Sequence, residues 1–369
     1  MQAPDIQSLG TQVLLAAFLL SCIFGAIAQK THFCTMGALS DVVNVGDWTR
    51  MRQWALAAGV AMIGFGVLAA VGWIDPTKSL YASNRLIWLS ALTGGLLFGF
   101  GMVLASGCGS KTLVRIGAGN LKSLVVFIVM GVAAFATLKG ITAVARVATV
   151  DTIAINLIAP GDLPTLTSGL FGLQIGSVRL IWALLLGGGL AGWALAGREF
   201  ARMDNLLAGL GIGAVIVAMW WVSGKLGHVA EHPDTLQEAF LATNSGRMEA
   251  LSFVSPVAYT VDWLMFFSDK SKVLTLGIVS VFGVVSGSAV WALASRRFRW
   301  EGFGGTEDLA NHLAGAVLMG VGGVTAMGCT VGQGLSGIST LSASSFVAVA
   351  AIMAGAVAGF RYQIWRLDQ

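Results

Sequence analysis

Nine long apolar segments limit this chain to folds that cross a lipid bilayer. A helix needs about 20 apolar residues to span the hydrocarbon core. Windows of roughly 17 or more occur at 11–29, 53–74, 87–107, 121–138, 179–197, 206–222, 273–295, 310–328 and 344–361. Only 11% of the residues are charged, against about 25% in soluble domains. We therefore expect an all-α polytopic membrane protein with about nine transmembrane helices.

The connections between these segments differ in length and carry further information. Those at 30–52, 139–178 and 223–272 are long enough to hold re-entrant or short helices. The chain contains 49 glycines, as expected where helices pack through small residues in lipid. The opening decapeptide MQAPDIQSLG has no Lys or Arg, so it lacks the charged region of a signal peptide, and we expect the first apolar segment to stay in the mature protein.

Basic residues predict the orientation of the chain. Cytoplasmic loops carry an excess of Lys and Arg, and an outside N-terminus places 13 of the 22 basic residues in such loops. They are Lys30, Arg50, Arg52, Lys111, Arg115, Lys122, Arg198, Arg202, Arg296, Arg297, Arg299, Arg361 and Arg366. We expect a periplasmic N-terminus and a cytoplasmic C-terminus. The net charge of +4 is small and scattered, which argues against nucleic acid as a partner.

An internal repeat is the most informative feature of the sequence. Residues 92–108, LTGGLLFGFGMVLASGC, align without a gap on 313–329, LAGAVLMGVGGVTAMGC, with nine identities in 17 positions. The expected topology gives the two copies opposite directions in the membrane. Inverted repeats of this kind build many transporters, with the substrate site at the repeat interface. We expect one transport domain over 1–369, with half-repeats at 11–178 and 179–369.

Each copy of the repeat ends on Gly-Cys and opens a glycine-rich turn. Irregular backbone at membrane depth is tolerated where it lines a polar cavity or is covered by protein, and a short helix after each cysteine would direct N–H groups at an anion. A third cysteine, Cys34, lies in the polar segment KTHFCTMGALSD. The candidate substrate path is Cys34, then Gly107, Cys108, Gly109, Lys111 and Arg115, then Gly328, Cys329, Thr330 and Gln333.

Other interpretations exist for several of these residues. A cysteine in a membrane helix often only packs, which we expect for Cys22; the alternative for Cys34 is a solvated loop thiol. The segment GCGSKT lacks the Gly before Lys of a phosphate-binding loop. His228 and His232 have helical spacing but no third ligand nearby, so we expect no metal site.

The three cysteine segments together resemble a known family. FCTMGALSD (33–41), GFGMVLASGCGSKTLVRIGAGN (99–120) and GVGGVTAMGCTVGQGLSG (320–337) are similar to the signatures of the YeeE/YedE family of sulfur-transport membrane proteins. The resemblance implies a bacterial inner-membrane protein with two pseudo-symmetric halves in an hourglass-like arrangement. It also implies that thiosulfate passes along a central path by weak contacts with Cys34, Cys108 and Cys329. A TusA-like cytoplasmic sulfurtransferase is the implied partner.

Two other functions stay open at this point. One is transport of a different sulfur or selenium species. The other is a membrane enzyme that transfers sulfur through a persulfide, which requires an activated thiolate. Thiols kept protonated in an apolar passage are poor nucleophiles, so transport without covalent chemistry, without a cofactor and without a metal is the simpler hypothesis.

Overall fold

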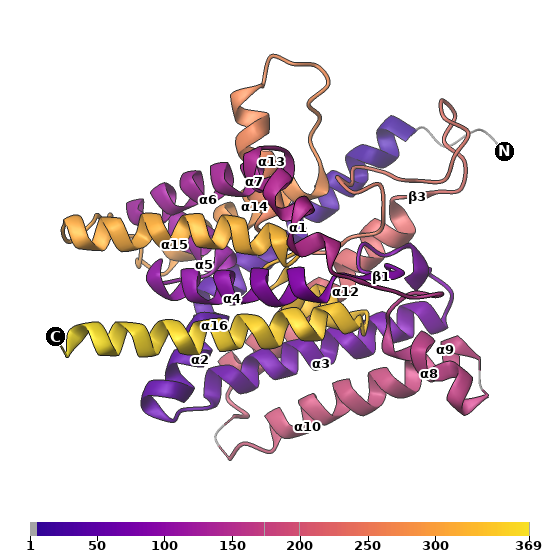
Figure 1. The fold of residues 1–369 in the computed structure, drawn as a ribbon, viewed down its shortest axis with the longest axis horizontal. Coiled ribbons are helices and arrows are strands. Elements are labelled where there is room, and N and C mark those ends of the chain that lie inside the picture. Colours follow the sequence, from indigo (N-terminus) through magenta and orange to yellow (C-terminus); the bar gives the residue numbers. More distant parts are fainter. Residues whose placement is uncertain (1–5, 173, 199, 369) are drawn as a thin grey trace.

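The computed structural model describes residues 6–172, 174–198 and 200–368, and its framework is helical (Figure 1). The long helices are α1 (Ile6–Thr31), α3 (Thr49–Ala70), α4 (Trp88–Leu104), α6 (Leu121–Lys139), α14 (Leu276–Ala294), α15 (Thr306–Thr325) and α16 (Ala343–Leu367). Two further long helices each consist of consecutive segments. The first comprises α9 (Ile175–Trp182), η4 (Ala183–Gly187) and α10 (Gly188–Leu195). The second comprises α11 (Met203–Leu206), η5 (Leu207–Gly211), α12 (Ile212–Trp221) and η6 (Val222–Leu226). We call the face where α1 begins the N-terminal face and the face where α16 ends the C-terminal face.

Short elements connect these long helices. They are α2 (Thr35–Ser40), η1 (Asp41–Val45), η2 (Pro76–Lys78), α5 (Gly109–Gly117), α7 (Ile141–Ala148), η3 (Val150–Thr152), α8 (Leu163–Phe171), α13 (Ser255–Met265) and η7 (Gly332–Gly337). Two small antiparallel ribbons complete the described part: β1 (Arg85–Leu86) pairs with β2 (Ile155–Asn156), and β3 (His228–Val229) pairs with β4 (Ala239–Phe240). Each of the three long connections therefore contains a short helix, as expected.

Eight of the described helical segments are long and apolar enough to cross a membrane. They match eight of the nine expected spans, and together with the helical framework they confirm an all-α polytopic membrane protein. The ninth expected span, 310–328, corresponds to α15. This helix begins in polar sequence, with Glu307, Asp308, Asn311 and His312 in its first turns, so it is less apolar than the others.

The two copies of the repeat pack against each other in antiparallel directions. A Cβ placed on Gly94 would lie 2.4 Å from the Ala326 nitrogen, and one on Gly315 would lie 2.6 Å from the Ala105 nitrogen. Gly94 and Ala105 occupy the same repeat positions as Gly315 and Ala326, so the contact is reciprocal. Only glycine permits so close an approach of two helix backbones. The division of the chain at residue 178 stays a prediction.

Neighbouring helices extend this reciprocity. A Cβ on Gly99 of α4 would lie 2.1 Å from the Ile352 oxygen of α16, and a Cβ on Gly320 of α15, at the equivalent position, would lie 2.6 Å from the Met130 oxygen of α6. Figure 1 shows α15, α4 and α16 side by side, and α6 next to α15. The helices α4 and α15 thus pack on each other between α16 and α6, and the breaks at their ends are buried.

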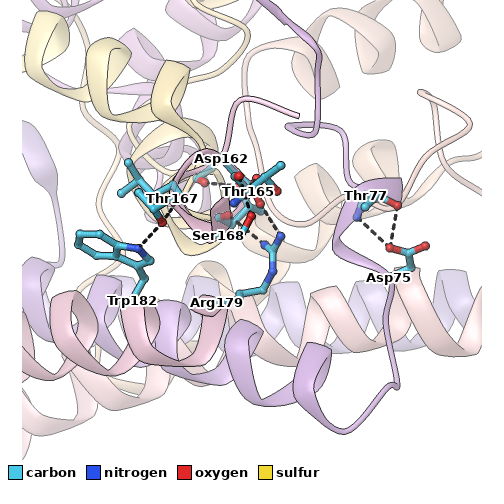
Figure 2. Close-up of polar contacts among 11 residues, drawn as sticks. Asp75, Thr77, Asp162, Thr165, Thr167, Ser168, Arg179 and Trp182 are labelled. Carbon is cyan, nitrogen blue, oxygen red and sulfur yellow. Dashed lines mark hydrogen bonds and ion pairs between the residues drawn. The ribbon is translucent and has the colours of Figure 1, made fainter. Parts of the chain in front are cut away.

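A buried ion pair fixes the N-terminal face next to the second copy of the repeat (Figure 2). Asp162 caps α8 by accepting from the Thr165 N–H at 3.3 Å, and it pairs with Arg179 of α9; both side chains are buried. Arg179 also donates to the Thr340 oxygen at 3.4 Å. Because an unpaired buried charge is costly, this pair ties α8 and α9 to the segment between η7 and α16.

Candidate functional site

Three breaks in the helical framework have the same local backbone. His32, Ser106 and Met327 have φ of 54°, 55° and 57°, and each lies two residues before a cysteine. A non-glycine residue in this left-handed region is uncommon. In each case it ends one helix and lets the chain begin a new helical segment after the cysteine: α2 after Cys34, α5 after Cys108 and η7 after Cys329.

The cysteine thiols take part in the start of these segments. The Cys34 Sγ accepts from the Gly37 N–H at 3.4 Å, and the Cys329 Sγ accepts from the Gly332 N–H at 3.4 Å. Each contact satisfies one of the free N–H groups that a helix start leaves. Cys108 has an additional partner, because its Sγ lies 3.3 Å from the Ser110 Oγ. The Cys108 thiol also interacts with the Lys111 N–H, which occupies the position equivalent to Gly37 and Gly332.

The structure brings the three thiols together in the protein interior. Cys34 and Cys108 are neighbours close enough to interact through their thiols, Thr330 lies beside Cys108, and Cys329 is within electrostatic range of Cys108. Cys108 and Cys329 are 0% exposed and Cys34 is 7% exposed. We call Cys34, Cys108 and Cys329 the thiol cluster. Among the described residues all the cysteines are free, and no group of three or more His, Cys, Asp or Glu side chains is arranged to hold a metal ion.

Cys22 lies apart from this cluster, in the middle of α1. There the backbone of Gly287 in α14 packs directly on it: a Cβ on Gly287 would lie 1.9 Å from the Cys22 oxygen. Its surroundings are those of a helix-packing position.

A cavity of about 530 Å³ opens below the thiol cluster toward the C-terminal face. We call it the basic cavity, because five Lys or Arg side chains and one Glu line it: Lys111, Arg115, Arg296, Arg297, Arg299 and Glu301. His32, two residues before Cys34, is also in its wall. Such an excess of positive charge in a concave surface attracts anions. Lys111 and Arg115 thus lie between the first repeat cysteine and the C-terminal face.

Different side chains form a hydrogen bond to the backbone at the helix break in each repeat copy. The Arg115 Nη1 donates to the Ser106 oxygen at 2.7 Å, and the Gln333 Nε2 donates to the Ala326 oxygen at 2.6 Å. The Gln333 Oε1 of the second copy is buried without a hydrogen-bond partner among the described residues, and the Thr330 hydroxyl has only the Cys108 thiol beside it. Buried polar atoms are normally paired, so the turn after Cys329 can form at least one further hydrogen bond, for which the described residues supply no partner.

The glycines of the path have distinct environments. A Cβ on Gly107 would meet the Lys111 side chain at 3.3 Å, and one on Gly109 would meet the Phe253 Cβ at 3.6 Å. Gly328 has φ of 158°, a conformation that L side chains rarely adopt.

Several residues around the thiol cluster were not predicted from the sequence. Tyr81 donates through its hydroxyl to the Gly332 oxygen at 2.6 Å, and Phe253 is fully buried beside Phe24, with ring centroids 5.6 Å apart. Both come from connections that carry no motif, so no sequence signal pointed to them. Ser110 lies inside one of the cysteine motifs and could have been found, because a hydroxyl two residues after a cysteine can contact its thiol.

Comparison with known proteins identifies the family of this site. The chain matches the sulphur transport family over residues 30–358, which includes all three breaks. The chain belongs to the sulphur transport family. The recognition made from the three cysteine motifs is confirmed.

Two curated relatives resemble the chain over most of its length, and a third resembles about a quarter of it. The chain is 26% identical over 332 residues to the thiosulfate transporter TsuA of Escherichia coli K12, covering 88% of this chain and 87% of the relative. It is 26% identical over 347 residues to TsuA of Spirochaeta thermophila, covering 91% and 94%. The probable transporter YedE of E. coli is 32% identical over 101 residues, covering 27% and 23%. These findings support a multi-pass membrane transporter of sulfur compounds rather than an enzyme.

Proposed function

We propose that the protein imports thiosulfate across the bacterial inner membrane along a path that passes the thiol cluster. The observation that carries the proposal is the meeting of three buried cysteines, from three separate breaks, at the centre of the bundle. The two relatives named as thiosulfate transporters cover about nine tenths of the chain and favour this anion over other sulfur or selenium species.

The chemistry of the cluster suits a passing substrate. Thiosulfate has a soft terminal sulfur and hard oxygens. A thiol is a weak donor and a weak acceptor, so each contact with the terminal sulfur is easily broken. Conduction needs binding that is strong enough for entry and weak enough for release. A series of weak thiol contacts meets both requirements, and the Thr330 hydroxyl beside Cys108 can donate to an oxygen.

The positive charge at the C-terminal face supports an inward direction of transport. The C-terminal face carries the basic cavity, and basic residues gather on the cytoplasmic side of membrane proteins. The N-terminal face is therefore periplasmic in our proposal. An anion leaving the thiol cluster enters the basic cavity on the cytoplasmic side, where a TusA-like sulfurtransferase would receive its sulfur.

Uptake of [35S]thiosulfate into liposomes containing the purified protein tests this function. We expect uptake that unlabelled thiosulfate competes and sulfate does not, because sulfate lacks the soft sulfur. Cys329→Ser should lower the rate at least about tenfold, which corresponds to roughly 1.4 kcal/mol, whereas Cys22→Ser, the matched control outside the cluster, should keep it. Equal competition by sulfate, or full uptake by Cys329→Ser, would contradict the proposal. A stable mass increase of one sulfur atom on the protein during turnover would favour the persulfide enzyme instead.

A further inference from the structure

A second cavity, of about 240 Å³, lies on the opposite side of the thiol cluster from the basic cavity. We call it the serine cavity, after the lining residues Ser245, Ser252, Ser255 and Ser280. Its volume is far above the ~15 Å³ that a single water requires. It lies among the ends of α6 and α15, the start of α14, α13 and the segment 244–252.

The serine cavity leads from the N-terminal face toward the thiol cluster. Its wall includes the exposed residues Asn244 and Ser245, and it also includes Met327, two residues before Cys329. Leu251, also in the wall and buried, accepts a hydrogen bond at its backbone oxygen from the Ser336 Oγ of η7 at 2.7 Å. The cavity is thus in direct contact with the turn that presents Cys329.

Two buried donors in this cavity have no acceptor. Ser280 of α14 is 1% exposed and its hydroxyl has no hydrogen-bond partner, and the Arg146 Nε of α7 is buried without a partner, among the residues that the structure describes. Leaving a buried donor unpaired is costly. A ligand with several acceptor atoms and negative charge would satisfy both groups, and the side chains of Ser252, Ser255 and Tyr259 offer further hydroxyls.

One lining residue opposes an anion. Glu249 is 9% exposed and forms no ion pair among the described residues. Its carboxylate accepts from the Asn244 N–H at 3.3 Å and the Ser245 Oγ at 2.9 Å, and it also interacts with the Ser245 N–H. Burial raises the pKa of Glu249 to about 7. An ionised carboxylate repels a neighbouring anion, whereas a protonated one can donate a hydrogen bond to it.

The charged groups near Glu249 do not neutralise it. Tyr259 of α13 and Tyr81 face the carboxylate. The ionic groups on the surrounding elements have other partners or are exposed. Three ion pairs involve them: Arg146 with Asp151, Lys78 with Glu238, and Lys272 with Asp262. Arg247 donates to the Ala82 oxygen, and Lys225 of η6 is exposed. Proton binding to Glu249 itself is therefore the available way to remove its charge.

We propose that the serine cavity is the entry site for the sulfur oxyanion and that it binds the anion when Glu249 carries a proton. This inference rests on the proposed transport and deepens it, since it makes uptake dependent on the pH of the N-terminal face. The Arg146 Nε and the Ser280 hydroxyl donate to the anion, and protonated Glu249 adds a donor where its ionised form would repel. The anion then reaches Cys329 past Met327.

Equilibrium binding of [35S]thiosulfate to the purified full-length protein in nanodiscs tests the site. Thiosulfate stays a dianion at neutral pH, so the protein alone sets the pH dependence. We expect wild-type affinity to fall about tenfold from about pH 6 to about pH 8, following the protonated fraction of Glu249. Glu249→Gln should bind equally at both pH values, with the affinity of the wild type at the lower one. Ser280→Ala should weaken binding at both.

The matched control is Glu231→Gln, which changes an exposed carboxylate in the same connection and should keep the wild-type profile. A Glu249→Gln protein with an unchanged pH profile would overturn the inference, and so would the absence of saturable binding to the wild type at the lower pH. Failure of the transport proposal is distinguishable: pH-dependent binding without uptake into liposomes would contradict transport alone, and uptake with pH-independent binding would contradict the entry site alone.

Discussion

The two copies of the repeat share a backbone and differ in the side chains that come after the cysteine. Ser106 and Met327 have nearly the same φ, 55° and 57°, and α4 and α15 contact each other through equivalent glycines. After the first cysteine come Lys111 and Arg115, which face the basic cavity. After the second comes Gln333, which is neutral and bonds the end of its own broken helix.

The comparison shows that different residues determine the backbone geometry of the breaks and the chemistry beside each thiol. Glycine spacing and the residue with positive φ set the geometry, so both thiols reach the centre from opposite directions. The side chains of the next turn then make the surroundings of the two repeat cysteines unequal. In the proposed function, this one basic end of a symmetric framework gives the anion a direction in which to leave.

The largest effect should result from breaking the shared framework. Gly94→Val or Gly315→Val would force a side chain into the backbone of the other repeat copy, where a Cβ would lie within 2.5 Å of its neighbours. Overpacking costs about 3 kcal/mol in severe cases, so we expect loss of most of the monodisperse protein in size-exclusion chromatography. Gly192→Val in α10, where nothing lies within 4 Å, is the control. Normal yield of both repeat variants would refute the reciprocal packing.

A large effect on transport should result from removing one positive charge from the basic cavity. Lys111 lines the basic cavity and forms no ion pair among the described residues, so its charge is available to an anion. Lys111→Gln should lower [35S]thiosulfate uptake about tenfold, or roughly 1.4 kcal/mol, without loss of folded protein. Arg198→Gln, on the same face outside the cavity, should retain uptake. Equal uptake by the two variants would mean that the basic cavity does not serve the substrate.

A moderate effect on stability should result from the titration of Glu249 in the serine cavity. Because the pKa of Glu249 is raised from 4.5 to about 7, the folded protein binds this proton more tightly than the unfolded chain does. Stability therefore falls as pH rises through that window. We expect the wild-type Tm to drop by a few degrees between about pH 5 and about pH 8, and Glu249→Gln to remove most of the drop. If Glu231→Gln removed it equally, Glu249 would not be its source.

The smallest effect should come from the cysteine outside the cluster. Cys22→Ala changes a half-buried packing position in α1, so uptake should stay within about twofold of the wild type, as for substitutions that cost under 0.5 kcal/mol. Cys34→Ala, made in the same way, removes a member of the thiol cluster and should cost much more. A comparable loss of uptake in both variants would show that general packing, not the cluster, explains the role of the thiols.

The sequence predicted the spans and the repeat because both depend on local patterns. Apolar length gives a helix, and glycine spacing with a terminal Gly-Cys gives a recurring break. The position of Cys34 beside Cys108 depends on how α1 packs through Gly25 and Gly287 on α14, which no local pattern encodes. The contacts of Tyr81 with Gly332 and of Leu251 with Ser336 likewise join segments remote in sequence. Hence the cysteines were predicted and their surroundings were not.

The most direct test of the thiol path is a structure of the protein bound to selenosulfate, the thiosulfate analogue whose terminal atom is selenium. Anomalous scattering would locate that one atom without ambiguity. Our account predicts a selenium peak in contact with the thiols of Cys108 and Cys329, at the meeting point of the two broken helices. A protein that binds selenosulfate in competition with thiosulfate, yet places the selenium away from all three cysteines of the cluster, would contradict it.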